Sequence, residues 1–479
     1  MRSRPGRRRP RVLLALVSVL YGVAQLLLVS PNLGIGWDET VYVSQVSPQA
    51  PPAVFSAPRA RGVPLLVAPV VVLTDSVFVL RLYLTVVSSA ALFGAFAVWL
   101  RIRDDHVVPL AALLFGSCWL SLFYGDQAMP NLYVALAAVA AAGLVVLAER
   151  SRTAPVGLAV TLAVMSLMRP SDALVAAVAL AAGALAILRR RRIAALAALA
   201  AGLAVGWGQW AVEAQARFGG LLARLREAGE HNATGWSLTI AEHARALDGP
   251  SLCRYGADCG PVSPVAVIWW LAIPAMTVLG LWSARRGPHL APLLLATGTA
   301  VAMALPYLFY VDYAAPRFLM PVYALLSLPV AQAAAAGLRL GHPPAAAGPR
   351  LGRTVAVAVA AGLLAHLALQ GAIAYGLAAA GRHDRAEIGR ATAELRRMGV
   401  RPPCMVYGQS GVQIGYLLGC DSQGIIQRFA EQAPARVRQA LRNGAQVVAV
   451  HKDVRLPPYM TAWDETDLPG PWSARFARR

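Results

Sequence analysis

The sequence predicts a polytopic α-helical membrane protein with about 11 transmembrane helices and a small α/β domain at its C-terminal end. Its 479 residues are 57% apolar and only 14% charged, whereas soluble domains are typically about half apolar and a quarter charged. The apolar residues also gather into runs about as long as a bilayer is thick. The net charge of +20 could indicate nucleic-acid binding. However, the arginines stand mostly at the ends of apolar runs, as the positive-inside rule describes.

The predicted spanning segments follow one another along most of the chain. They cover residues 12–30, 77–100, 107–123, 131–148, 156–169, 172–188, 193–210, 264–282, 290–309, 318–337 and 354–376. Every second connection is rich in arginine, which predicts a cytoplasmic N-terminus and, after an odd number of helices, an extracytoplasmic C-terminal tail. Between residues 156 and 188 polar residues interrupt the apolar run, so a tight outer turn and a re-entrant pair both remain open. The Ala-, Arg- and Gly-rich composition favours a plasma-membrane location.

The chain divides into two predicted domains. A transmembrane domain covers residues 1–376 and includes a first outer loop at 31–76 and a large outer loop at 211–263. An extracytoplasmic α/β domain covers residues 377–479, where charge increases and no spanning run occurs. We expect strands at 404–407 and 447–450 and a helix at 435–441. Gly408, Gly411 and Gly415 miss the spacing of the dinucleotide fingerprint, so we interpret them as turn and packing glycines.

Four of the five cysteines fall in segments predicted to lie outside the membrane. Cys253 and Cys259 belong to the large outer loop, and Cys404 and Cys420 belong to the tail, whereas Cys118 stands alone in a helix. An oxidising exterior permits disulfides, so these two pairs are disulfide candidates. Free thiols are the alternative.

The first outer loop carries the most informative chemistry. Asp38 and Glu39 stand between Trp37 and Tyr42, close to the end of the first apolar run. Ionisable groups near membrane depth are costly and by default mark a working site, although a solvated loop with two ordinary acids is the alternative. Other polar residues belong to the same predicted face: Asp126, Gln127, Arg169, Asp172, Asp312, Tyr313 and Arg317.

If the helices form a bundle, these outer ends could converge on one cavity that contains at least two acids and two arginines. A carboxylate can take a proton from an acceptor hydroxyl, and a guanidinium can hold a phosphate leaving group. The set therefore suits transfer chemistry on an anionic lipid. Interfacial snorkelling is the alternative explanation for Arg169 and Arg317.

Three short motifs resemble those of the GT-C glycosyltransferases, the superfamily of protein O-mannosyltransferases and lipid A aminoarabinose transferases. Residues 37–42 resemble the Asp-Glu-x-x-Tyr motif of the first outer loop, and Asp126 resembles the second acidic position. Residues 316–321 resemble the Arg-aromatic-x-x-Pro segment at the start of a late helix. The resemblance extends over about residues 12 to 337, and it depends on the order and spacing of the motifs, because each motif alone is degenerate.

The resemblance implies a fold of eleven to thirteen helices and inverting transfer of a sugar from a polyprenyl-phosphate donor to an acceptor hydroxyl on the outer face. Asp38 would be the general base, with Glu39 orienting it or helping to bind a metal. Asp126 would shape the acceptor side, and Arg317 would neutralise the lipid phosphate as it leaves. Tyr42 and Arg169 are further candidates for substrate binding. Polysaccharide, lipid and protein acceptors all remain open.

Metal dependence and the class of activity are not fixed by these motifs. A divalent metal ion is possible, but no clear ligand set is present, and His231 and His243 are candidates by location only. A transporter or flippase of a lipid-linked saccharide would also need many helices, but it commonly has repeated halves, and we find no internal repeat. A scaffold without activity would tolerate loss of Asp38, and the intact acid pair argues against it.

Overall fold

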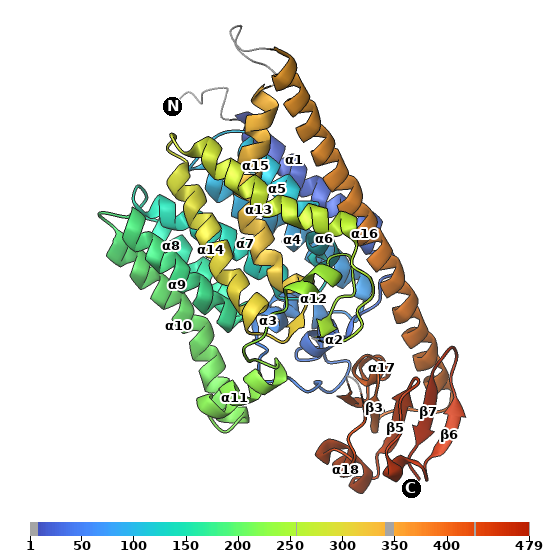
Figure 1. The fold of residues 1–479 in the computed structure, drawn as a ribbon. Helices are drawn as coiled ribbons and strands as arrows, with labels where there is room; N and C mark the ends of the chain where they lie inside the picture. The colour runs from blue at the N-terminus through green and yellow to red at the C-terminus, as the bar shows by residue number, and fades with distance from the viewer. Residues whose placement is uncertain (1–7, 255, 341–348, 426–427, 479) are drawn as a thin grey trace.

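The structure is a computed structural model that describes residues 8–254, 256–340, 349–425 and 428–478. Among these residues, nine helices are long and apolar enough to cross a membrane, or ten if a bent pair is counted as one span. The helices pack into one bundle with a small domain below it (Figure 1). The predicted class, a polytopic helical membrane protein with a C-terminal α/β domain, is therefore confirmed.

All eleven predicted segments are helical, but two of them differ from simple spans. The helices are α1 (Arg8–Ala24) with its π-helical end η2 (Gln25–Val29), α4 (Val77–Leu100), α5 (Val107–Gly116), α6 (Trp119–Gly125), α7 (Asn131–Ala148), α8 (Ala154–Met168), α9 (Pro170–Ile187), α10 (Arg192–Arg217), α13 (Pro264–Ala284), α14 (Leu290–Phe309), α15 (Met320–Leu340) and α16 (Pro349–Arg397). Helix α8 has only 15 residues, and the predicted segment 107–123 is bent by 69° between α5 and α6. The count of eleven therefore includes one short helix and one broken helix.

The break between α5 and α6 is held by polar side chains of α16. The backbone N–H of Trp119 donates to Oε1 of Gln370 at 2.9 Å, and Oγ of Ser117 lies 3.0 Å from Nε2 of His366. Backbone groups that a break releases inside a bilayer must find partners in neighbouring helices. The contacts with α16 supply such partners.

Helix α7 occupies the centre of the bundle and is buried along almost its whole length. Small residues allow neighbouring helices to approach closely inside a membrane. A Cβ atom at Gly143 would lie 2.8 Å from Cγ1 of Val98, so glycine is needed where α7 meets α4. The indole N–H of Trp99 donates to the carbonyl of Val139 at 2.9 Å and joins the same two helices.

Short elements cover the end of the bundle that faces the small domain. These are α2 (Trp37–Val43), α3 (Gly62–Val71), α11 (Leu221–His231), α12 (Ile240–Arg245), the strands β1 (Cys253–Arg254) and β2 (Tyr313–Ala314), and the 3-10 turn η3 (Pro316–Leu319). Strands β1 and β2 pair antiparallel, with Arg254 opposite Tyr313, and the structure joins Cys253 to Cys259 in a disulfide. The large outer loop is therefore fastened to the segment that enters α15.

The C-terminal domain is a five-stranded mixed sheet. Its strands are β3 (Cys404–Gly408), β4 (Asp421–Gly424), β5 (Gln446–His451), β6 (Asp464–Asp467) and β7 (Ser473–Phe476). Their order is β4-β3-β5-β7-β6, so β4 is an edge strand. Strands β4, β3 and β5 are parallel, and β7 and β6 continue the sheet antiparallel.

Two helices and a disulfide complete this domain. Helix α17 (Gly411–Leu418) connects β3 to β4, and α18 (Ala435–Arg442) precedes β5. The predicted strands at 404–407 and 447–450 and the helix at 435–441 are present, whereas α17 replaces an expected glycine-rich turn. Gly408 has a φ of 133°, and a Cβ there would lie 2.0 Å from the Val450 carbonyl oxygen. The structure joins Cys404 to Cys420.

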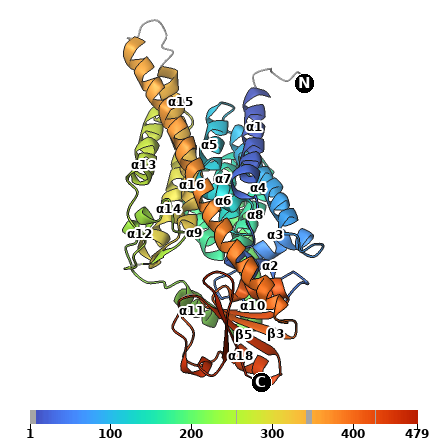
Figure 2. The ribbon, with the colours of Figure 1, turned by 90° about the vertical axis from the view of Figure 1, so that its right-hand side faces the viewer.

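Helix α16 connects the bundle to this domain without interruption. It has 49 residues and continues through the predicted boundary at residue 377 to Arg397. Figure 2 shows it passing along the bundle and ending at the sheet. The small domain therefore begins as an extension of a membrane helix.

Candidate active site

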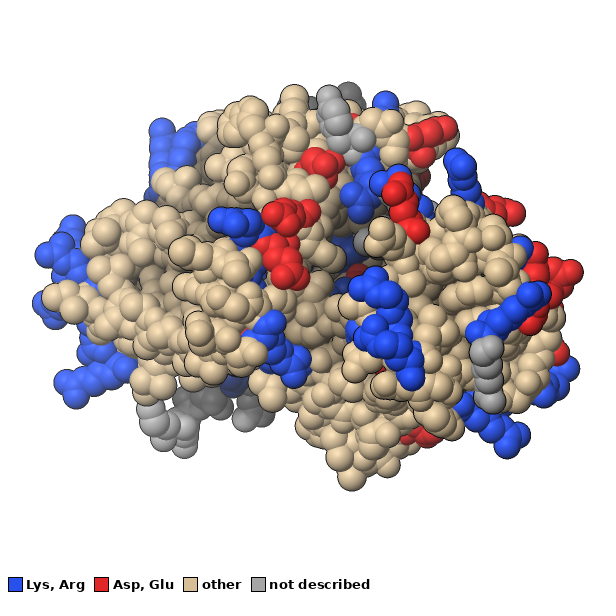
Figure 3. Space-filling view, turned by 90° about the horizontal axis from the view of Figure 1, so that it is seen from below, with Lys and Arg blue, Asp and Glu red and all other residues tan. Residues whose placement is uncertain are grey.

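A cavity of about 790 Å³ lies where the bundle, the outer-loop elements and the C-terminal domain meet. Four predicted site residues line it, namely Asp38, Tyr42, Arg169 and Arg317. Its walls also include residues of α10, α11 and strand β4. Seen from the side of the small domain, the surface is hollowed between two masses, with basic and acidic side chains along the hollow (Figure 3).

Asp38 is the one carboxylate among the described residues that line this cavity. It stands in the first turn of α2, and its side chain is 33% exposed. Nη2 of Arg59 donates to Oδ1 at 2.6 Å, and Nη2 of Arg317 donates to Oδ2 at 3.4 Å. Burial opposes ionisation, but the two guanidiniums outweigh it and lower the pKa of Asp38. Asp38 is thus an anion held in place by two cations.

Glu39 has a different environment, although it is the next residue. Its side chain is buried against Arg81 of α4, which donates to both carboxylate oxygens. The backbone N–H groups of Gly36 and Ala128 each donate to Glu39 at 2.9 Å. The bond from Gly36 is half of a capping box at the start of α2. Burial would raise the pKa of Glu39, but Arg81, Arg385 and the Ala128 N–H lower it to about 2.

Both carboxylate oxygens of Glu39 therefore accept hydrogen bonds from other groups of the protein. Arg385 of α16 lies 3.6 Å from Oε2 and donates to the Gly34 carbonyl at 2.6 Å. Arg81 also donates to the carbonyls of Gly34 and Asp126, both at 2.8 Å. Glu39 thus joins α2 to α4, α16 and the end of α6, and this network fixes the position of Asp38.

Asp126 is fully buried and is not among the residues that line the cavity. The hydroxyl of Ser30 donates to its Oδ2 at 2.5 Å, while its Oδ1 has no hydrogen-bond partner among the described residues. Burial raises the pKa of Asp126 to about 6. The structure places this carboxyl behind Glu39, on the side of the bundle core.

Arg169 belongs to the tight connection between α8 and α9 and is held rigidly. Its Nε lies 2.9 Å from Oδ2 of Asp172, and Nη2 donates to the Tyr307 hydroxyl at 2.8 Å. Tyr307 in turn donates to Asp172, and the guanidinium lies 4.6 Å from the centroid of the Phe318 ring. The cavity therefore has a cationic group fixed in advance, which favours binding of an anion.

Arg317 and Tyr42 complete the surroundings of Asp38. Arg317 is part of η3, and its Nη1 donates to the carbonyl of Ser251 at 3.2 Å. The guanidinium of Arg59 lies 4.8 Å from the centroid of the Tyr42 ring, and Tyr42 packs edge-on against Phe55. Tyr42 therefore supports Arg59, which in turn holds Asp38.

The residues that the structure describes do not fit a metal site. No group of three His, Cys, Asp or Glu side chains that could hold a metal ion occurs among them. His231 lines the cavity, and burial together with Arg59 lowers its pKa. His243 is buried, lies 3.3 Å from the Tyr307 carbonyl, and has a pKa lowered to about 4 by burial.

Sequence reasoning missed Arg59, Arg81 and Arg385. Arg81 could have been identified from the sequence, because it is an ionisable residue inside an apolar spanning run and such residues usually have a function. Arg59 and Arg385 gave no such signal, since each is one of many arginines in polar segments. Their roles depend on contacts between residues 21 and 351 positions apart in the chain.

Comparison with solved structures agrees with this architecture. The chain is similar to ArnT from Cupriavidus metallidurans bound to undecaprenyl phosphate, with a TM-score of 0.57 and 15% identity over 97% of each chain. It is also similar to the oligosaccharyltransferase AglB from Archaeoglobus fulgidus in complex with an inhibitory peptide and a dolichol-phosphate. That match has a TM-score of 0.56 and 14% identity, and it covers 92% of this chain and 69% of AglB. No family model and no curated protein sequence matches the chain. The chain therefore has the GT-C fold of these membrane proteins.

Proposed function

We propose that this protein is a membrane glycosyltransferase that moves a sugar from a polyprenyl-phosphate donor to an acceptor hydroxyl. The observation that carries the proposal is the placement of Asp38 in a cavity at the end of the bundle, between Arg59 and Arg317. The two solved structures support it, because ArnT is bound to undecaprenyl phosphate and AglB is an oligosaccharyltransferase bound to a dolichol-phosphate.

In the proposed reaction Asp38 is the general base. The acceptor oxygen attacks the anomeric carbon while the bond from that carbon to the phosphate oxygen breaks, and the acceptor proton passes to Asp38. A single displacement of this kind inverts the anomeric centre. The electron pair of the broken bond stays with the polyprenyl phosphate, whose charge increases, so guanidiniums at the cavity stabilise it as it leaves.

The other residues of the site have separate proposed roles. Arg317 and Arg169 face the cavity and would hold the lipid phosphate, while Tyr42 lines the substrate site. Glu39 acts as a positioning residue, because Arg81 and two backbone N–H groups donate to its two oxygens and it does not line the cavity. Asp126 would stabilise the same network from behind, since it does not reach the cavity.

We propose a plasma-membrane location with the N-terminus in the cytoplasm and the C-terminal domain outside. The arginine-rich connections support this orientation through the positive-inside rule. An acceptor polysaccharide, lipid or protein and the donor lipid would then meet at the outer face. The two disulfides, Cys253–Cys259 and Cys404–Cys420, suit an oxidising exterior.

The proposal is tested by incubating the purified full-length protein with radiolabelled polyprenyl-phosphate sugars and a membrane extract as acceptor. Wild-type protein should transfer label from at least one donor. Asp38→Asn should lower turnover by about 10² to 10⁴, the usual contribution of a general base, and should leave the unfolding midpoint almost unchanged. Equal transfer by wild type and Asp38→Asn would reject Asp38 as the base. Absence of transfer from every donor would favour a transporter or a scaffold.

A further inference from the structure

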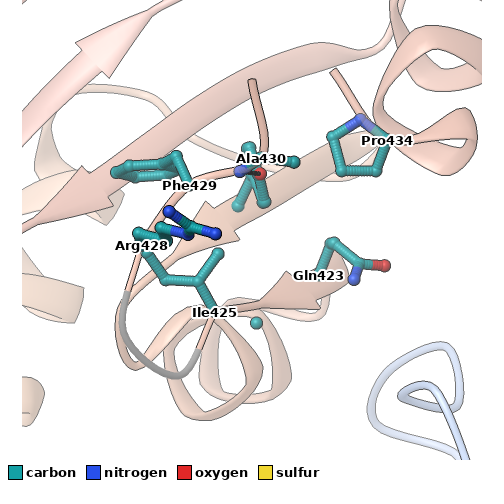
Figure 4. A pocket seen from close by; sticks show the side chains of 8 residues that line it. Gln423, Ile425, Arg428, Phe429, Ala430 and Pro434 are labelled. Carbon is teal, nitrogen blue, oxygen red and sulfur yellow. Dashed lines mark hydrogen bonds between the residues drawn. The ribbon is translucent and has the colours of Figure 1, made fainter. Parts of the chain in front are cut away.

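A second pocket in the C-terminal domain adjoins the cavity. Its volume is about 270 Å³, and Gln423, Gly424 and Ile425 line both spaces. The other walls of the pocket are formed by Tyr407, Arg428, Phe429, Ala430 and Pro434. Figure 4 shows the Arg428 guanidinium directed into the space between Phe429 and Ile425, with Gln423 and Pro434 on the opposite side. Strand β4 is thus a wall common to the two spaces.

Strand β4 is fixed close to the candidate base. A Cβ atom at Gly424 would lie 2.0 Å from Cη2 of Trp37, so the indole packs directly on the strand backbone, and Trp37 precedes Asp38 in the chain. Nearby, Gln413 of α17 donates to the carbonyl of Ile35 at 3.3 Å, and Tyr416 donates to Oγ of Ser47 at 3.1 Å. The lining shared by the two spaces therefore packs against the residue that precedes Asp38.

The two spaces have an excess of positive charge. Arginines at positions 59, 169, 254, 317 and 428 line them, while Asp38 is the single acidic residue of the described lining. Arg59 and Arg317 pair with Asp38, and Arg169 pairs with Asp172.

The other two arginines, Arg254 and Arg428, have no carboxylate partner among the described residues. Among the described residues no ion pair or hydrogen bond involves the side chain of Arg428, which is exposed, or the side-chain amide of Gln423. Arg254 has a cation–π contact with Tyr313. A free guanidinium is suited to bidentate recognition of carboxylate or phosphate. Apolar walls with a few polar groups are typical of a site for a small organic unit.

We propose that this pocket and strand β4 form an acceptor subsite for an anionic saccharide, with Arg428 holding a carboxylate or phosphate on a unit beyond the reacting hydroxyl. This assignment depends on the proposed transferase function for its biological meaning. The binding itself requires no donor, so it can be tested separately. Gln423 would donate and accept hydrogen bonds with hydroxyl groups of the same unit.

The experiment measures binding of three probes to the full-length protein in detergent micelles by isothermal titration calorimetry. The probes are trigalacturonic acid, its fully methyl-esterified and therefore uncharged form, and a glycerol phosphate trimer. We expect at least one anionic probe to bind and the methyl ester to bind at least tenfold more weakly. Arg428→Ala should weaken anion binding by about 10- to 100-fold, as for loss of hydrogen bonds to a charged group. Arg428→Lys should restore part of the affinity.

Arg442→Ala is the matched control, since Arg442 is an exposed arginine of the same domain outside the pocket lining, and it should bind like wild type. Preference for the uronic acid or for the glycerol phosphate identifies the source of the anion, and either result supports the subsite. Equal binding of the charged and esterified probes, no binding of any probe, or indifference to Arg428→Ala would overturn it. Failure of transfer from every donor would remove the proposed function and leave this binding result standing.

Discussion

Nη2 of Arg317 lies 3.4 Å from Oδ2 of Asp38, although 279 residues separate the two in the chain. The contact joins the first turn of α2 to the turn that precedes α15. It brings a proton acceptor and a cation together at one cavity wall. Arg317 therefore helps to keep Asp38 ionised, and a substitution of either residue changes the electrostatic environment of the other.

Arg317→Gln should lower kcat by about 10²- to 10³-fold, the range for removal of one group that stabilises charge in the transition state. The reason is that the departing phosphate gains charge only as the sugar bond breaks. Steady-state kinetics of transfer measure this, and Arg317→Lys should be intermediate because it keeps the charge. Arg285→Gln, in a connection at the opposite end of the bundle, is the control. A rise in the donor KM with kcat unchanged would show that Arg317 only binds the ground state.

Arg59→Gln should move the acidic limb of the kcat/KM profile to higher pH. The pKa of Asp38 is lowered mainly by Arg59 and then by Arg317, against the effect of burial. The ionised base is present above that lowered pKa and is lost as pH falls through it. Removing Arg59 raises the pKa, so the loss begins at a higher pH. His231 also lines this cavity, and burial together with Arg59 lowers its pKa. An unchanged acidic limb in Arg59→Gln would contradict the assignment.

Glu39→Gln should destabilise the fold much more than Asp38→Asn, because Glu39 is buried whereas the side chain of Asp38 is 33% exposed. Removing one partner of a buried ion pair typically costs about 3–5 kcal/mol, because the other charge is left unpaired, and Arg81 is only 2% exposed. The pKa of Glu39 is lowered to about 2 from an ordinary 4.5. Its contribution to stability is therefore complete above pH 4.5 and is lost as pH falls toward 2.

Thermal unfolding in detergent checks this contrast between the two acids. The midpoint of Glu39→Gln should fall clearly below that of wild type, while Asp38→Asn should stay close to it. If Glu39→Gln unfolds at the wild-type temperature, Glu39 does not fix α2, and its place in the network would need another explanation.

Treatment with EDTA should leave transfer unchanged. Asp38 is engaged by two guanidiniums, Glu39 is saturated by donors within the protein, and Asp126 does not reach the cavity. Initial rates are measured before and after dialysis against the chelator, then with added Mg²⁺ or Mn²⁺. Activity that disappears on dialysis and returns with one of these ions would show that the outer-face carboxylates rearrange to bind metal.

The sequence predicts the membrane part of this fold well, because each span can be recognised from its own run of apolar residues. It does not predict the break between α5 and α6. No proline stands at Ser117 or Cys118, and the break is held by Gln370 and His366, about 250 residues further along the chain. Helix α3 was also missed, since its apolar run has ten residues and is shorter than a span.

The candidate site was predicted in part for the same physical reason. The motif around Asp38 is local and can be recognised in one loop, and Arg169 and Arg317 stand at helix ends where polar groups are conspicuous. By contrast, the separate functions of Asp38 and Glu39 depend on which arginine faces each of them. Which arginine faces which acid is determined by tertiary packing among α2, α4 and α16, and the local sequence does not predict it.

Because α16 is continuous, insertions or deletions in it would rotate and shift the small domain relative to the bundle. A helix of 49 residues is about 74 Å long at 1.5 Å per residue, and it carries Arg385 to Glu39 before it reaches the sheet. One inserted residue before Arg385 would rotate everything that follows by about 100°, because a turn contains about 3.6 residues. Insertion of a near-whole turn before Arg385 would nearly restore the rotation, but the shift along the helix axis would still separate Arg385 from Glu39. The number of residues in α16 therefore determines the position of Arg385 and of the sheet relative to the bundle, in addition to the identity of those residues.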